Sequence, residues 1–107
     1  FAGRVSVVPA PDEALPAVDG IVNTTPVGMT KLPGMPLDPG LLVTGQWYCD
    51  VIYFPRETEL LVAARNKGCR VMPGSGMAIF QAVKAFELFS GQVPDVAGMA
   101  QTFHVEA

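Results

Sequence analysis

Residues 47–53 read WYCDVIY, a nearly unbroken apolar run in which Asp50 is the one charged residue. Such a run is typical of a strand that is covered on both faces within a parallel sheet. Thr58 can act as the N-cap of a helix over residues 59–67, and Gly68 can supply the left-handed position that ends it. A strand followed directly by a capped helix predicts an α/β fold.

The same alternation of strands and helices extends to both sides of this unit. Pro26 and Gly91 mark the ends of other elements, and the prolines and glycines of residues 30–40 predict a surface loop. The expected strands are residues 4–8, 20–24, 47–53 and 69–72, and the expected helices are residues 12–18, 59–67, 77–90 and 95–104. This order predicts a parallel sheet layered with helices.

Composition indicates one small domain with an unusually apolar content. Of the 107 residues, 50% are hydrophobic and 16% are charged. A domain of this size has a large surface for its volume, so we expect part of its apolar surface to lie against another segment. The net charge is -3 and the seven Lys and Arg residues are scattered, so no nucleic acid is expected as a partner.

Two further patterns bear on where the protein resides. The longest apolar stretch, residues 41–54, contains polar interruptions and is shorter than the ~20 residues of a membrane helix, so no membrane partner is expected. Cys49 and Cys69 both lie in strand-like apolar runs. This predicts reduced thiols in a cytoplasmic protein.

Polar residues follow two of the expected strands, at the edge where α/β proteins bind ligands. The sequence Asn23-Thr24-Thr25-Pro26 can bond a ribose, a pyrophosphate or a neighbouring backbone, or it can form only a turn. Tyr53 ends the strongest strand, where its hydroxyl can orient a polar substrate or simply meet water. Both interpretations stay open from spacing alone.

The GSG turn at residues 74–76 lies between a strand and a helix start, so its backbone can approach a ligand closely. Met77 and Gln81 share one face of the following helix, and the Gln81 amide can bind a hydroxyl-rich ligand or face solvent. Asp50 requires hydrogen-bond partners if it is buried, which favours a structural role for it over catalysis.

Other catalytic templates do not fit. His104 lies near the C-terminus, away from any Ser or Cys at a strand end, and neither metal-ligand spacing nor a Walker loop occurs. A Tyr-x-x-x-Lys pair is also missing, because Ile52 and Glu57 stand four positions after Tyr48 and Tyr53. We therefore assign no catalytic residue and no metal to this chain.

In their order and spacing, three stretches together resemble the shikimate dehydrogenase family, which includes the shikimate/quinate dehydrogenases. They read GIVNTTPVGM at residues 20–29, DVIYFPRETELL at residues 50–61 and GMAIFQAVKAF at residues 76–86. The resemblance implies the second half of a Rossmann-type, doubly wound parallel sheet with C-terminal helices. It also implies an oxidoreductase that transfers a hydride between NAD or NADP and shikimate or quinate.

The resemblance further implies roles for individual residues. Tyr53 and Gln81 would contact the small-molecule substrate. The residues implied to bind the cofactor are Asn23, Thr24, Thr25, Val51, Gly74 and Met77. The catalytic Lys and Asp of the family, its glycine-rich turn and the residues that choose between NAD and NADP have no counterpart here.

We therefore expect residues 1–107 to form the C-terminal half of an NAD(P)-binding domain, without the N-terminal substrate domain and the glycine-rich loop, and to be inactive alone. Two alternatives stay open. The chain can be a small α/β interaction or regulatory module without catalysis, or a self-contained enzyme that acts through Tyr53, Asp50 and Gln81.

The expected sheet order has a consequence for the first two strands. In the order 3-2-1-4-5-6, residues 4–8 would be strand 3 without either neighbour, and residues 20–24 would form an exposed edge. We expect residues 4–8 to shift beside residues 20–24, or two copies of the chain to associate through these edges.

Overall fold

The computed structural model describes the backbone of residues 3–106 and the side chains of residues 3–103. Its centre is a parallel sheet of three strands in the order β1-β2-β3. The strands are β1 (Gly20–Asn23), β2 (Trp47–Asp50) and β3 (Arg70–Met72). The α/β fold with a parallel sheet, predicted from the sequence, is thereby confirmed.

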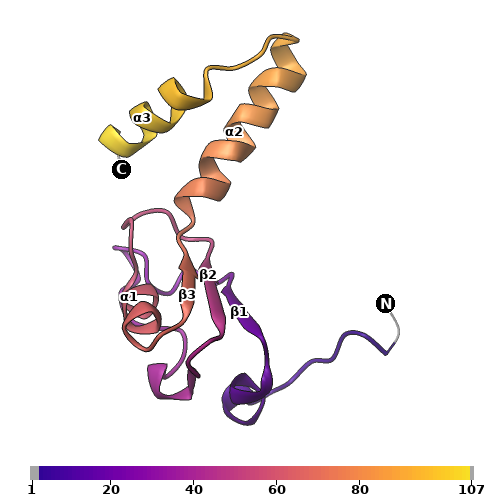
Figure 1. Cartoon of the computed structure of the whole chain (residues 1–107), viewed down its shortest axis with the longest axis vertical. Helices are drawn as coiled ribbons and strands as arrows, with labels where there is room; N and C mark the ends of the chain where they lie inside the picture. The colour runs from indigo at the N-terminus through magenta and orange to yellow at the C-terminus, as the bar shows by residue number, and fades with distance from the viewer. Residues whose placement is uncertain (1–2, 107) are drawn as a thin grey trace.

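Helix α1 (Glu59–Asn66) connects β2 to β3 and packs against both strands (Figure 1). At its start the backbone N–H of Leu61 donates to the Thr58 hydroxyl oxygen at 3.2 Å. Gly68 follows its end with a φ of +92°, a conformation that side chains with a Cβ rarely adopt. Both predicted ends of this helix are therefore confirmed.

One face of the sheet carries the core. The buried cluster consists of Ile21, Leu42, Tyr48, Leu60, Leu61, Ala64 and Cys69. Beside it, the buried Gln46 side chain ties the segment before β1 to the sheet, since its Nε2 donates to the carbonyls of Leu15 and Val18 at 2.8 Å each. The sheet and α1 thus bury one apolar layer between them.

The opposite face of the sheet is open. Side chains alternate along a strand, so Val22, Trp47 and Met72 point away from α1, and all three are exposed. The Trp47 indole lies over Gly20, where an added Cβ would stand 1.8 Å from Cε2 of the ring. A residue larger than glycine at this position would displace the indole.

Two helices follow the sheet. Helix α2 (Ser75–Ser90) projects away from it and buries only Ile79 among its described residues. After Gly91, in the left-handed region with φ 69°, helix α3 (Val96–Glu106) turns back toward the sheet (Figure 1). The radius of gyration is 16.2 Å, against about 13 Å for a compact domain of this length. Much apolar surface on α2 consequently stays uncovered.

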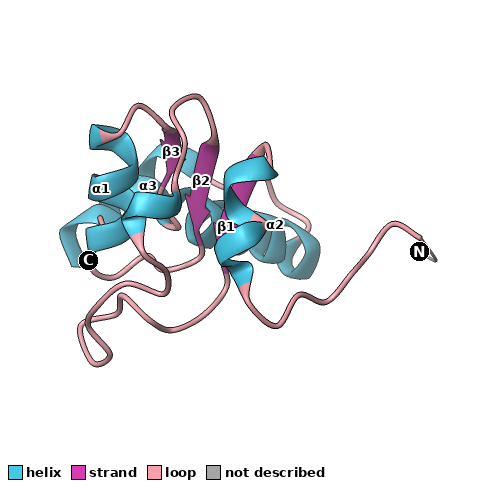
Figure 2. Ribbon diagram, turned by 90° about the horizontal axis from the view of Figure 1, so that it is seen from below, coloured by secondary structure: helices cyan, strands magenta, loops and turns pink. Residues whose placement is uncertain are grey.

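The strand predicted at residues 4–8 is wrong. This segment forms no strand and runs away from the sheet, and Val7 is 94% exposed (Figure 2). A β-branched run becomes a strand only beside a neighbour that pairs with its backbone, and β1 pairs with β2 alone among the described strands. The predicted shift of residues 4–8 beside β1 is therefore also wrong.

The remaining differences from the predicted elements are smaller. Instead of one helix over residues 12–18, the chain forms two 3-10 turns, η1 (Pro11–Glu13) and η2 (Leu15–Ala17), because Pro16 interrupts regular helix hydrogen bonding. The predicted loop over residues 30–40 ends in a third turn, η3 (Pro39–Leu41). Strand β2 is shorter than predicted because its pairing partner β1 ends at Asn23.

A buried carboxylate lies where β2 ends. Asp50 is 4% exposed and accepts from the Tyr48 hydroxyl at 3.0 Å and from the Thr58 hydroxyl at 2.6 Å, both on Oδ2. Burial, together with the adjacent Asp50 carboxylate, raises the pKa of Tyr48 above its ordinary value. The phenol therefore keeps its proton and donates to the Asp50 carboxylate. Asp50 thus has hydrogen-bond partners inside the protein, as expected for a structural role.

Replacing Tyr48 by Phe should lower the free energy of unfolding by about 1–3 kcal/mol, because it removes one donor from a buried carboxylate. Since the pKa of Tyr48 is raised in the folded state, wild-type stability should also fall as the pH rises above about 10, where only the unfolded chain loses the proton. The variant should lack this decline. Denaturant titrations at pH 7 and pH 11 measure both effects, with the exposed Tyr53→Phe change as control.

Candidate functional site

The carboxyl ends of the three strands meet at one edge of the sheet, where a cavity of about 710 Å³ opens. The loops after β1 and β2 form most of its wall, and α3 contributes Phe103 to it. Figure 1 shows α3 beyond this edge of the sheet. The lining residues are Thr24, Thr25, Pro26, Met29, Val51, Ile52, Tyr53, Phe54 and Phe103. The wall is mainly apolar and includes three side chains that carry a hydroxyl.

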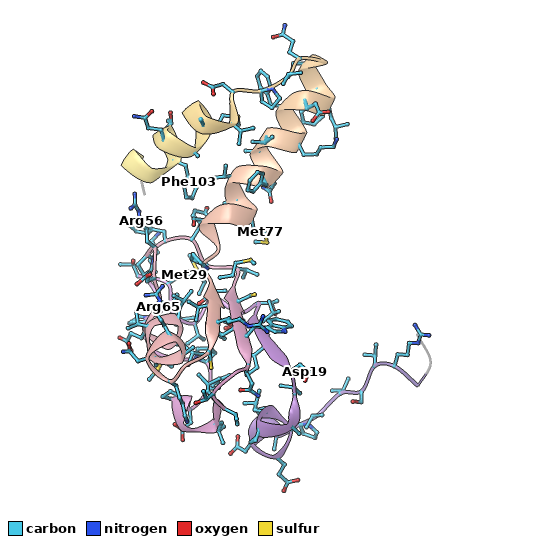
Figure 3. The ribbon with its side chains drawn as sticks, viewed as in Figure 1. Asp19, Met29, Arg56, Arg65, Met77 and Phe103 are labelled. Carbon is cyan, nitrogen blue, oxygen red and sulfur yellow. The ribbon has the colours of Figure 1, made fainter. Side chains whose placement is uncertain are left out.

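Two aromatic rings meet at this cavity. The ring centroids of Tyr53 and Phe103 are 5.6 Å apart, with an angle of 56° between the rings. Figure 3 shows Phe103 on the side of α3 that faces the sheet edge. Tyr53 is 49% exposed, so its ring packs against the wall while part of the residue faces solvent. Such a placement suits the orientation of a polar ligand against an apolar surface.

The turn between β3 and α2 lies directly against the loop after β2. The backbone N–H of Gly74 donates to the Ile52 carbonyl at 3.2 Å. A Cβ at Gly74 would stand 2.5 Å from that oxygen and 2.6 Å from the Val51 carbonyl group. Because these are backbone atoms, they cannot move aside as a flexible side chain would. This close approach, rather than a positive φ, is what requires glycine here.

Asn23 lies behind the cavity rather than in its wall. It is 5% exposed, and its side-chain oxygen accepts from the Thr25 backbone N–H at 3.0 Å and from the Thr25 hydroxyl at 2.6 Å. Its amide nitrogen donates to the Val27 carbonyl and to Asp50 Oδ1, each at 3.2 Å. Asn23 thus ties the loop after β1 to the end of β2.

The structure brings some of the predicted site residues together and leaves others apart. Thr24, Thr25, Val51 and Tyr53 line the cavity, whereas Gly74 supports the loop that carries Val51. Met77 and Gln81 lie on the exposed surface of α2 and are not among the lining residues. Figure 3 shows Met77 near the base of α2.

Met29 and Phe103 line the cavity although the sequence analysis assigned them no role. Met29 comes shortly after Asn23 in the sequence. This proximity to the polar stretch after β1 could have indicated that Met29 lies at the cavity. Phe103 offered no such signal, because its place depends on the return of α3 to the sheet edge.

Among the described residues, none of the helices has both the length and the apolar character of a membrane span.

Cys49 and Cys69 are free thiols.

A parallel sheet whose carboxyl edge carries loops around an apolar cavity is the arrangement of a Rossmann-type nucleotide-binding domain. The order β1-β2-β3 corresponds to one half of such a sheet. Comparison with known proteins specifies the class further. Residues 74–102 match the family model of the shikimate 5'-dehydrogenase C-terminal domain.

The chain is 50% identical over 92 residues to the quinate/shikimate dehydrogenase (NAD(+)) of Corynebacterium glutamicum, an alignment that covers 86% of this chain and 32% of that protein. It is 56% identical over 77 residues to the shikimate dehydrogenase (NADP(+)) of Streptomyces avermitilis, covering 72% of this chain and 26% of that protein. The solved structure of quinate dehydrogenase from C. glutamicum in complex with NAD is similar to this chain, with a TM-score of 0.85 and 48% identity, covering 89% of this chain and 34% of that one.

The chain therefore belongs to the shikimate dehydrogenase family, and it spans about a third of the length of the relatives that it matches. The Rossmann-like α/β fold that the resemblance implied is confirmed by this likeness.

Replacing Gly74 by Ala should destabilise the protein by about 1–3 kcal/mol, because the added methyl group overlaps the carbonyls of Val51 and Ile52. Gly76→Ala is the matched control, since a Cβ at Gly76 meets nothing within 4 Å. In the first turn of α2 that control should be neutral or stabilising by up to about 1 kcal/mol. Thermal unfolding compares the two variants, and equal midpoints would contradict the close approach.

Proposed function

We propose that this chain is part of an NAD(P)-dependent dehydrogenase that transfers a hydride between the cofactor and shikimate or quinate. The observation that carries the proposal is the cavity at the carboxyl edge of the sheet, with Tyr53 beside an apolar wall. It is supported by the 50% identity to a quinate/shikimate dehydrogenase. The corresponding biological role is the metabolism of aromatic amino-acid precursors or of quinate.

The composition of the cavity wall fits one end of the dinucleotide. Met29, Ile52 and Phe103 provide an apolar surface against which a flat nicotinamide ring can pack. None of the described lining residues is Lys or Arg, so the wall is less suited to the pyrophosphate. The bound cofactor would supply or accept the hydride, and this chain would orient the ring and exclude water from it.

Individual residues take roles within this proposal. Thr24 and Thr25 line the cofactor cleft, and Asn23 belongs to the same loop. The backbone near Val51 and Gly74 lies against the nicotinamide, as supported by the contact between these two segments. Met77 is the further ring contact of this proposal; it lies outside the cavity lining, and its exposed side chain at the base of α2 is available to a ligand that extends beyond the cavity.

Tyr53 and Gln81 contact the substrate in this proposal. The hydroxyl of Tyr53 can bond a polyol, and its exposure supports that role. The Gln81 amide can both donate and accept, and it lies one helical turn after Met77 on α2. The chain itself contributes no proton-transferring residue, so we assign positioning and binding to it and place the proton transfer outside it.

The exposed surface favours this proposal over the two alternatives. The accessible area is 7394 Å², whereas a compact monomer of 11.3 kDa exposes about 5,700 Å². A self-contained module or enzyme would be expected to cover more of its apolar side chains. Asp50, which the second alternative would use for catalysis, has both carboxylate oxygens occupied by hydrogen bonds.

We also infer that the isolated chain self-associates through its sheet edges. Strand β1 has β2 as its one described neighbour, so its outer backbone edge is open, and Val22 beside it is exposed. A cytoplasmic location is part of the same proposal, supported by the free thiols of Cys49 and Cys69.

The 107-residue chain, expressed alone, should neither oxidise shikimate or quinate nor bind NAD or NADP tightly, because its sequence contains neither the glycine-rich turn that would bind the pyrophosphate nor the family's catalytic pair. The natural protein that carries this chain should do both. Absorbance of the reduced cofactor measures turnover, and light scattering measures the size of the isolated chain. Turnover by the isolated chain would contradict the proposal that this chain only binds and positions the ligands. A monomer at all concentrations would contradict the proposed self-association.

In the natural protein, Tyr53→Phe should lower kcat/KM for shikimate or quinate by about 5- to 150-fold, which corresponds to the loss of one hydrogen bond of about 1–3 kcal/mol to the bound substrate. The KM for the cofactor should change much less. Ser90→Ala is the control, since it removes a hydroxyl that bonds the Phe86 carbonyl at the end of α2 and lies outside the cavity lining. An unchanged kcat/KM in the Tyr53→Phe variant would remove Tyr53 from the substrate site.

A further inference from the structure

We propose that Asn23 and Asp50 are positioning residues, a buried amide and carboxylate that hold the loop after β1, and with it the cavity wall formed by residues 24–26, in its binding shape. The inference rests on the proposed function, in which that wall borders the cofactor. In this inference Asn23 does not contact the cofactor directly. Its side chain acts by holding the loop after β1.

The hydrogen-bonding capacity of the Asn23 side chain is fully used inside the protein. Its oxygen accepts two bonds from Thr25, and its nitrogen donates one bond to Val27 and one to Asp50. An amide has two donor hydrogens and two acceptor lone pairs, so none is left for a ligand. Asn23 can therefore influence a bound cofactor only through the residues it holds.

Only one orientation of the Asn23 amide satisfies this set of partners. The Thr25 backbone N–H can only donate, so the oxygen must face it. The Val27 carbonyl and Asp50 Oδ1 can only accept, so the nitrogen must face them. Turning the amide over would set its oxygen against a carboxylate and its NH₂ against an N–H group. The pair thus defines a single arrangement of the loop.

Asp50 fixes the other end of the connection. Its carboxylate also accepts from the Ile52 backbone N–H at 3.3 Å and from the hydroxyls of Tyr48 and Thr58. These donors belong to β2, to the loop after it and to the start of α1. The carboxylate is therefore held in place, and Asn23 joins the loop after β1 to this fixed point.

The hydroxyl of Thr25 is occupied in the same way. It donates to the Asn23 oxygen and accepts from the Val27 backbone N–H at 3.3 Å. Thr25 lines the cavity, so what it presents there is its methyl group and backbone more than a free hydroxyl donor. The network thereby converts a polar stretch of sequence into a shaped, largely apolar wall.

Asn23→Asp tests the pair in the natural protein. The variant keeps the shape of the side chain and the oxygen that accepts from Thr25. An oxygen replaces the donor NH₂, so that two carboxylates lie side by side. The Asn23 amide nitrogen and Asp50 Oδ1 are 3.2 Å apart. Two carboxylates at this separation share one proton, so the pKa of the pair in the folded variant rises above the ordinary value of about 4. The titratable side chains at this point are Asp50 and Tyr48, both from β2, and the nearest ion pair along the chain, Glu57 with Arg65, is exposed.

At pH 8 the variant should bind NAD or NADP at least about 5-fold more weakly than the wild type, because it loses both hydrogen bonds that the Asn23 NH₂ donates. The affinity should recover in part as the pH falls through the raised pKa, because the protonated carboxyl group restores one donor. The exposed Asn66→Asp change adds the same charge elsewhere and should show neither effect. Calorimetric titration with each dinucleotide between pH 5 and pH 8 measures this. Unchanged affinity, or a loss without recovery at low pH, would overturn the proposal.

Two further measurements cover the remaining outcomes. If Asn23→Asp does not fold, Thr25→Val removes the hydroxyl from the same network and should weaken cofactor binding at least about 5-fold, while the unfolding midpoint falls only as far as the lost hydrogen bonds of an exposed residue predict. Unchanged binding in that variant overturns the proposal. If the wild type binds neither dinucleotide, the proposed function fails, and the unfolding midpoint of Asn23→Asp against pH then tests the pair. Stability should be full below about pH 4 and be lost as the pH rises through the raised pKa, relative to Asn66→Asp. The same pH dependence of the unfolding midpoint in Asn23→Asp and Asn66→Asp would overturn the proposed pairing of residue 23 with Asp50.

Discussion

The buried carboxylate of Asp50 is the constraint around which the sheet edge is organised. A carboxylate that is 4% exposed is costly to bury unless hydrogen bonds replace its water, and here four donors do so. They come from β1, from β2 and the residues after it, and from the start of α1. Thr58 donates to Asp50 while it caps α1, which also places the negative charge near the positive end of that helix.

The cavity depends on this arrangement although Asp50 does not line it. The polar groups that hold the loops lie behind the wall, and the wall itself is formed mainly by apolar side chains and backbone. This separation allows an apolar surface to be shaped by directional hydrogen bonds. The wall thus combines an apolar surface with the partly exposed side chain of Tyr53.

The sequence predicted most of the elements because their signals are local. Helix α1 has its cap residue, its body and its terminating Gly68 within a dozen positions, and its ends were predicted to within one residue. Residues 4–8 carry an equally local β-branched pattern, but a strand needs a neighbour, and none is available there. The candidate site was predicted in part: Thr24, Thr25, Val51 and Tyr53 meet at the cavity, whereas Phe103 reaches it through the return of α3.

The sequence by itself determined the α/β class, the parallel strands and the edge at which a ligand would bind, since periodicity, caps and strand order are properties of neighbouring residues. Only the tertiary structure decided that the Asn23 amide faces inward. Its partner Asp50 is 27 positions away and becomes its neighbour through the pairing of β1 with β2. Whether a polar side chain binds a ligand or holds a loop depends on which groups across the sheet occupy its donors and acceptors, and that follows from register and burial rather than from residue type.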